Sequence, residues 1–193
     1  IYCNPDGKME YSGVLEDDEI MQIMRAGIKS GITRVHWTGG EPTLRDMETL
    51  IGSSKELGYV DQVLTTNGSR GGDYVRRMAN QGLDRLIVSL DTVDPQKFKV
   101  ITKRDCLEAV IDTIKTSVEI LEQPTKMNIV YLKDTGDEIP GLISLAREIN
   151  RIPDKKGSLV IKFIEMTEMN PVFFSEKGKQ SYIKNHAGKD IMM

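Results

Sequence analysis

Five short apolar runs rich in β-branched residues constrain the fold of this sequence more than any other feature. Their lengths suit strands that are buried on both faces better than they suit helices. Amphipathic helical patterns separate the runs, so the chain alternates between strand and helix. The predicted strands are residues 34–38, 62–66, 85–91, 126–132 and 159–165, and the predicted helices are residues 16–29, 47–57, 74–80, 107–121 and 137–149.

This alternation indicates repeated βαβ units and therefore an α/β fold with a parallel sheet. Five units fit a partial (β/α) barrel better than a closed eightfold barrel, which takes at least about 200 residues. A doubly wound sheet is the structural alternative, but no glycine-rich phosphate loop follows the first strand. We expect a barrel core at residues 1–166 and a polar, lysine-rich irregular extension at residues 167–193.

The net charge and the hydropathy of the sequence exclude some classes of binding partner. The net charge of -3 gives the chain no basic field, so duplex nucleic acid is not an expected partner. No apolar run approaches the roughly 20 residues that span a bilayer, and the sequence does not open like a signal peptide. We therefore expect no membrane partner and a cytoplasmic location.

Polar residues stand at or near the end of every predicted strand. In a parallel barrel these ends converge on one mouth, where reactive residues gather. Any one of the segments alone also suits an ordinary turn or a strand rim. Together they predict a polar mouth for a zwitterionic or phosphorylated ligand. The segments are Gly39-Gly40-Glu41, Thr65-Thr66-Asn67, Ser89-Leu90-Asp91, Lys126 with Asn128, and Lys162 with Glu165.

Several segments resemble the motifs of one enzyme family. Residues 38–42 (TGGEP) resemble the motif with which radical S-adenosylmethionine (SAM) enzymes hold the methionine amino group of SAM. Residues 1–3 (IYC) resemble the end of their CxxxCxxC motif, which binds a 4Fe-4S cluster. Residues 64–68, 88–92, 101–105, 126–128 and 163–166 resemble, in order and spacing, the GTP cyclases of molybdenum-cofactor biosynthesis. The resemblance covers residues 1–166 and implies a radical SAM barrel that lacks its first strand.

The resemblance also implies a role for each matching residue. Cys3 would ligate the cluster, whose open iron binds SAM; an electron from a donor then cleaves SAM to a 5′-deoxyadenosyl radical. Thr65 and Lys126 match the side of the mouth that binds GTP, and an ammonium there would pair with a phosphate or carboxylate. The residues implied to contact SAM are Tyr2, Gly39, Gly40, Ser89 and, on its ammonium, Glu41.

Two departures from the family pattern concern the substrate. His36 stands where the family has the second Arg of a basic pair that begins here with Arg34, and Lys162 also stands in place of an Arg. A titratable ring thereby replaces a permanent, fork-shaped cation. We assign His36 and Lys162 to the substrate side, although His36 also suits a packed strand histidine. A paralogue that acts on another nucleotide or on a peptide is therefore an alternative.

The two cysteines bear on whether the chain is complete. Cys106 suits a packing position at the start of a helix. Cys3 alone cannot hold a 4Fe-4S cluster, so we expect a truncated, inactive piece of a longer enzyme. A nucleotide-binding barrel that has lost its cluster and a metal-free phosphate-binding barrel are further alternatives. The truncated edge would expose a strand, which makes a homodimer compatible with the sequence.

Overall fold

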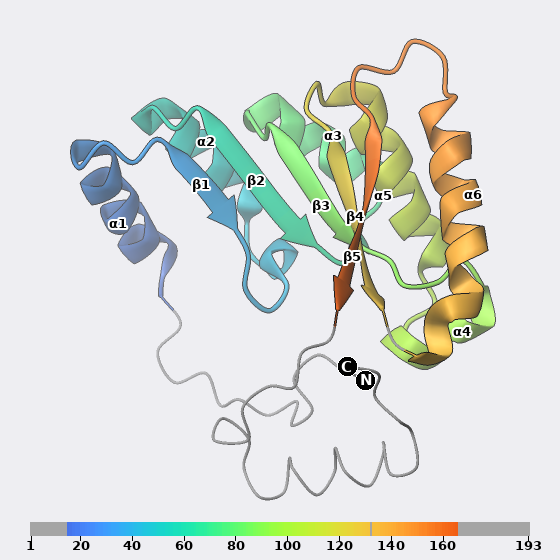
Figure 1. Ribbon diagram of the computed structural model, residues 1–193. Coiled ribbons are helices and arrows are strands. Elements are labelled where there is room, and N and C mark those ends of the chain that lie inside the picture. The colour runs from blue at the N-terminus through green and yellow to red at the C-terminus, as the bar shows by residue number, and fades with distance from the viewer. Residues whose placement is uncertain (1–14, 132, 166–193) are drawn as a thin grey trace, which may run out of the picture.

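The computed structural model describes residues 15–131 and 133–165. These residues form a five-stranded sheet, and helices connect its strands (Figure 1). Tyr2, Cys3 and the predicted extension at residues 167–193 lie outside the described residues. The elements are α1 (Asp17–Lys29), β1 (Arg34–Trp37), the 3-10 turn η1 (Pro42–Leu44), α2 (Met47–Leu57), β2 (Asp61–Thr66), α3 (Gly72–Gln81), β3 (Arg85–Ser89), α4 (Pro95–Thr102), α5 (Leu107–Ile120), β4 (Thr125–Tyr131), η2 (Lys133–Glu138), α6 (Ile139–Asn150) and β5 (Leu159–Glu165).

The strand order decides between the two α/β architectures. The order β1-β2-β3-β4-β5 follows the chain without reversal, and all neighbouring strands are parallel. A doubly wound sheet would instead reverse its order at a switch point. Helix α1 packs on α2, α2 on α3, and α3 on α5. In Figure 1, α2, α3 and α5 lie behind the sheet. This arrangement is that of a partial (β/α) barrel and confirms the predicted fold class.

The sheet buries one face beneath the helices. Leu64, Leu86 and Met127 on this face have no exposed surface. Because successive side chains of a strand point to opposite faces, their neighbours along the chain line the other face, which we call the open face. The parallel register arranges the open face in rows across the strands. One row is Thr65, Ile87, Lys126 and Val160, and the next is Ser89, Asn128 and Lys162.

A buried glutamine links three elements on the helix side. The side chain of Gln62 accepts hydrogen bonds from Trp37 Nε1, at 3.2 Å, and from Ser54 Oγ. Its Nε2 donates to the Ile51 carbonyl at 2.9 Å. A buried polar group without partners would destabilise the fold by about 1–3 kcal/mol, and Gln62 avoids this by tying β1 and α2 to β2.

Helix α4 is absent from the predicted set, although the sequence contains its start signal. Asp94 caps the helix, because its Oδ1 accepts hydrogen bonds from the backbone N–H groups of Gln96 and Lys97 at 2.8 and 2.9 Å. Pro95 then occupies the first turn, where a missing N–H is harmless. The helix ends at Thr102, and its C-cap residue Lys103 takes the left-handed conformation with φ 61°. The turn that follows lies at the carboxyl ends of the strands.

Candidate functional site

A cavity of about 550 Å³ lies at the carboxyl ends of the strands and is called here the mouth cavity. Its volume falls within the range of about 300–1,000 Å³ that is common for small-molecule sites. The predicted SAM residues Gly39, Gly40, Glu41 and Ser89 all line it, and so does Thr65. The structure therefore brings together residues that lie up to 50 positions apart in the chain, as Gly39 and Ser89 do.

Glu41 fixes the Gly39–Gly40 loop to the end of β2. Its Oε1 accepts hydrogen bonds from Thr43 N at 3.2 Å, Thr43 Oγ1 at 2.6 Å and Thr66 Oγ1 at 2.7 Å. Its Oε2 accepts from Asn67 N at 2.8 Å. Each carboxylate oxygen has two lone-pair sites, and Oε2 accepts a single hydrogen bond among the described residues, so Oε2 keeps one site for a donor from a ligand. Positioning of the loop is a role for Glu41 that the motif alone did not reveal.

His36 and Thr65 form a pair on the open face. His36 Nε2 and Thr65 Oγ1 lie 2.7 Å apart. The ring is exposed, so the interpretation of His36 as a packed strand histidine is wrong. Both residues are predicted on the substrate side, and the hydrogen bond joins them on the open face. The register pairs His36 with Val63, which lies one row before Thr65 on β2.

Lys126 and Lys162 also lie on the open face but do not line the mouth cavity. Lys126 is half-buried and Lys162 is exposed. Within residues 15–131 and 133–165, neither ammonium forms an ion pair or a hydrogen bond. Asn128, between Ser89 and Lys162 in the register, lines the mouth cavity. Its Oδ1 is buried and has no hydrogen-bond partner among the described residues.

Asp91, which follows β3, connects the end of this strand to β4 through a hydrogen bond. Its Oδ1 accepts a hydrogen bond from Val130 N at 2.7 Å. Burial raises the pKa of Asp91 above its usual range, and the hydrogen bond from Val130 opposes that shift. Asp91 therefore adds an acidic group of altered basicity to the wall of the mouth cavity.

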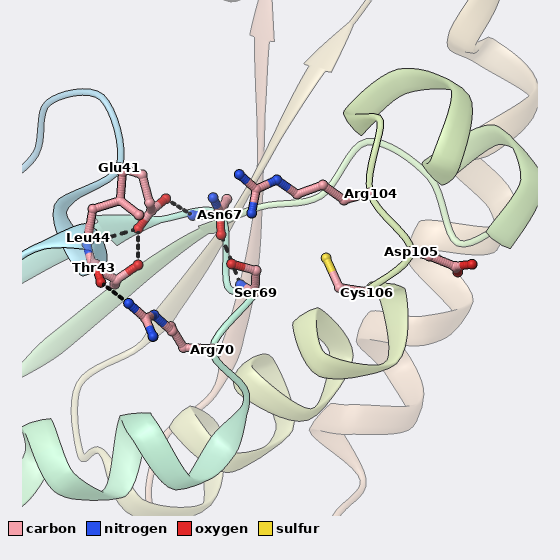
Figure 2. A pocket seen from close by; sticks show the side chains of 9 residues that line it. All are labelled: Glu41, Thr43, Leu44, Asn67, Ser69, Arg70, Arg104, Asp105 and Cys106. Atoms are coloured by element: carbon pink, nitrogen blue, oxygen red, sulfur yellow. Dashed lines mark hydrogen bonds between the residues drawn. The ribbon is translucent and has the colours of Figure 1, made fainter.

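A second cavity, of about 460 Å³, adjoins the mouth cavity and is called here the side cavity (Figure 2). It shares Glu41, Asn67, Ser69, Arg104 and Cys106 with the mouth cavity. Its other lining residues are Thr43, Leu44, Arg70 and Asp105. Cys106 stands at the N-terminal end of α5 and packs partly against the core, as predicted, but it also faces both cavities.

Comparison with known sequence families identifies the superfamily of this chain. The sequence pattern of the radical SAM superfamily matches residues 1–146. The chain belongs to the radical SAM superfamily. Solved radical SAM structures share its fold: SuiB from Streptococcus suis bound to SAM superposes with a TM-score of 0.63 at 17% identity. The superposition covers 93% of this chain and 42% of that chain. At this identity the likeness shows the fold alone.

Curated relatives within the superfamily are named "Probable GTP 3',8-cyclase". The protein of that name from Methanococcus maripaludis is 34% identical over 169 residues, which cover 86% of this chain and 55% of the relative. The one from Pyrococcus horikoshii is 37% identical over 153 residues, which cover 78% of this chain and 49% of the relative. The chain thus spans about half the length of the curated relatives that it matches.

The mouth cavity fits SAM, the cofactor that gives this superfamily its name. Gly39 has φ 140°, and a Cβ added to it would meet no atom within 4 Å, so a ligand can approach its backbone. Asn128 Oδ1, which has no partner in the described part of the chain, offers an acceptor, and SAM carries amine and hydroxyl donors. In the described part of the chain, no three His, Cys, Asp or Glu residues are grouped to hold a metal ion. Cys3 therefore remains a predicted cluster ligand outside the described residues.

The turn between α4 and α5 forms one wall of the site that the sequence did not predict. Ile101 and Thr102 from the last turn of α4 line the mouth cavity, and so do Lys103 and Arg104 from the turn that follows. The Asp94-Pro95 helix start could have revealed α4, but no local signal shows that its end folds over the strand ends. Among the described helices, none is both long and apolar enough to cross a membrane.

Proposed function

We propose that the protein to which this chain belongs cyclises GTP by radical SAM chemistry, in the step of molybdenum-cofactor biosynthesis that forms the cyclic pterin precursor. The relatives named "Probable GTP 3',8-cyclase" support this proposal at 34% and 37% identity. The order and spacing of the motifs over residues 1–166 support it as well.

The open face carries the main structural support for an anionic nucleotide substrate. Lys126 and Lys162 project from neighbouring strands, and neither ammonium has a partner among the described residues. The His36–Thr65 pair lies on the same face, two strands away from Lys126. Cations without intramolecular partners favour phosphate groups, because each one can form a charge-assisted hydrogen bond. We assign His36, Thr65, Lys126 and Lys162 to the substrate.

The assigned cofactor residues would bind and orient SAM. Tyr2, Gly39, Gly40, Glu41 and Ser89 would contact it, with the free lone pair of Glu41 Oε2 toward its ammonium. Cys3 would be one ligand of the 4Fe-4S cluster. When bound, cluster and SAM together supply a 5′-deoxyadenosyl radical, which the resemblance assigns to removal of a ribose hydrogen.

Further partners follow from this chemistry. Radical SAM cleavage needs an electron, so we propose an electron donor as a partner of the intact protein. We also propose a cytoplasmic location, and a homodimer remains compatible with the chain. Inactivity of the 193-residue chain by itself is likewise a proposal, based on its single predicted cluster ligand.

The test is an anaerobic assay of the natural full-length protein. Reconstituted with iron and sulfide, and supplied with SAM and dithionite, it should release 5′-deoxyadenosine when GTP is added. ATP, GDP and guanosine should give much less. Release that does not depend on GTP would contradict the proposed substrate but leave the radical SAM assignment in place.

A binding experiment separates the substrate role of Lys126 from general charge effects. Lys126→Gln removes a cation from the open face and should weaken GTP binding by about tenfold or more, the effect of one charge-assisted hydrogen bond. Lys29→Gln is the matched control, because Lys29 is an exposed lysine on α1. Equal GTP affinity in both variants would remove Lys126 from the substrate site.

A second function is favoured by one observation. His36 occupies the position where the resemblance expects Arg, and it is engaged by Thr65 at 2.7 Å. The replacement of Arg by His36 is compatible with a radical SAM paralogue whose substrate is another nucleotide or a peptide. The same 5′-deoxyadenosine assay distinguishes the GTP cyclase from such a paralogue when nucleotides and peptides are compared as the added substrate. A nucleotide-binding barrel without a cluster would bind GTP but release no 5′-deoxyadenosine.

A further inference from the structure

The side cavity has cationic groups on two walls. Arg70 comes from the loop after β2, and Arg104 comes from the turn between α4 and α5. In Figure 2 the Arg104 side chain extends toward Asn67, while Arg70 extends toward Thr43. The family motifs assign no role to this cavity, and the comparisons name no ligand for it.

Arg70 is held in position by its neighbours. Its NH2 group donates a hydrogen bond to the Thr43 carbonyl at 2.8 Å. Its guanidinium carbon lies 5.7 Å from the ring centroid of Tyr74, within the range of a cation–π contact. These contacts fix the planar group and leave further N–H donors for a ligand. A fixed guanidinium loses less conformational entropy when a ligand binds.

The Arg104 side chain lacks a partner among the described residues. In the part of the chain that the structure describes, its guanidinium forms neither a hydrogen bond nor an ion pair. Its backbone is nevertheless ordered by the turn, because Arg104 N donates to Thr102 Oγ1 at 3.1 Å. Thr102 Oγ1 in turn donates to the Phe98 carbonyl at 2.8 Å. The turn therefore presents an unpaired cation to both cavities.

Two carboxylates, Glu41 and Asp105, stand on the same walls as these arginines. Glu41 accepts its four hydrogen bonds from neutral groups of Thr43, Thr66 and Asn67, and among the described residues it forms no ion pair with either arginine. Asp105 is paired with Lys99, whose Nζ lies 2.9 Å from its Oδ2. When Lys99 is counted with the Asp105 that it pairs, three cations on and beside these walls stand against two carboxylates, and this surplus of one positive charge favours an anion.

We propose that the side cavity is an anion site that takes a phosphate group, with Arg70 and Arg104 as its two cations. Guanidinium groups match phosphate oxygens with paired N–H donors. A volume of about 460 Å³ admits a group of pyrophosphate size, whose oxygens can serve two arginines. The phosphate comes either as a free polyphosphate or as the tail of a nucleotide. This site does not depend on the proposed GTP cyclisation, since it rests on these two side chains alone.

The test measures binding of magnesium-free pyrophosphate to the 193-residue chain by calorimetry. Arg104→Gln should weaken binding by about tenfold or more. It should leave the thermal unfolding midpoint unchanged, since the guanidinium has no partner to lose among the described residues. Arg25→Gln is the matched control, an exposed arginine on α1 that also lacks a partner in the described part of the chain. Its pyrophosphate affinity should match that of the parent.

GTP and guanosine distinguish the two sources of phosphate. If pyrophosphate binds and Arg104→Gln removes that binding, free polyphosphate is sufficient and the proposal is supported. If only GTP binds, and Arg104→Gln weakens GTP but not guanosine, the phosphate is delivered by a nucleotide and the proposal is again supported. The proposal is overturned if Arg104→Gln and Arg70→Gln bind both ligands as the parent does, or if the parent binds neither.

Discussion

At the scale of single residues, Glu41 holds its loop in place and still keeps an acceptor site at the mouth cavity. Its four hydrogen bonds come from the η1 turn and from the end of β2. They hold the Gly39–Gly40 backbone at the mouth cavity while one lone pair of Oε2 stays free. A Gly-Gly-Glu motif therefore builds the site as well as lining it.

Glu41→Gln should destabilise the protein by about 1–3 kcal/mol, because one carboxylate oxygen becomes an NH2 group that faces donors. Hydroxyl hydrogens can rotate away from that group, but the backbone N–H of Asn67 cannot. Urea unfolding measures the change in the free energy of unfolding. Glu56→Gln on α2 is the control, since Glu56 is exposed and its carboxylate has no partner among the described residues. Equal stability of the two variants would show that the Glu41 network contributes nothing.

At the scale of elements, a buried carboxylate fastens α4 to the start of α6. The Glu138 side chain is 8% exposed and accepts hydrogen bonds from Lys97 Nζ and Thr92 Oγ1. Lys97 belongs to α4, and Glu138 immediately precedes α6. The contact therefore joins segments more than 40 residues apart and positions the helix whose C-terminal turn lines both cavities.

The Glu138 contact predicts a pH-dependent stability. The hydrogen bonds from Lys97 and Thr92 lower the pKa of Glu138, against the opposing effect of burial. A carboxyl group whose folded pKa is lowered stabilises the fold above its unfolded pKa, about 4.3, and loses that effect as the pH falls through the folded value. Glu138→Gln should therefore reduce the free energy of unfolding by about 1–3 kcal/mol at pH 7. The difference from the parent should shrink below about pH 4.

Urea unfolding at pH 7 and in acid measures this difference. Asp105→Asn supplies the control, because the Lys99–Asp105 pair is exposed and such pairs contribute about 0–1 kcal/mol. A Glu138→Gln effect that stays constant with pH would show that its charge is irrelevant to the contact.

At the scale of the whole molecule, the sheet has a central part and two edges among the described residues. β2, β3 and β4 each have strands on both sides, α5 packs on β3 and β4, and α3 packs on α5. α1 buries Met21 and Met24 only, next to the edge strand β1. Burial is therefore unequal along the chain, and local stability should follow it.

Native-state hydrogen exchange should show this gradient. The amides of β2–β4 and α5 should exchange most slowly, with protection close to the free energy of global unfolding, and those of α1 should exchange first. Mass spectrometry of peptic fragments gives the order. Uniform protection from α1 to β5 would mean that the sheet opens as one unit, against this prediction.

The sequence by itself determined the repeating pattern. Strand β5 and helix α2 begin and end at the predicted residues, because apolar periodicity and caps such as Gly58 act locally. The Gly39-Gly40-Glu41 motif likewise identified one wall of the mouth cavity from the residue types alone. The resemblance to the radical SAM superfamily rests on short segments, and their order and spacing can be read directly from the sequence.

Only the tertiary structure decided which polar groups meet. The His36–Thr65 hydrogen bond spans 29 residues, and Glu41 reaches Asn67 across 26 residues. The side cavity joins Arg70 to Arg104 because α4 folds its C-terminal turn over the strand ends. These contacts depend on strand register and on the packing of one helix, which involve residues distant in sequence. Local patterns carry no information about such distances, and so the second cavity became visible only in the folded chain.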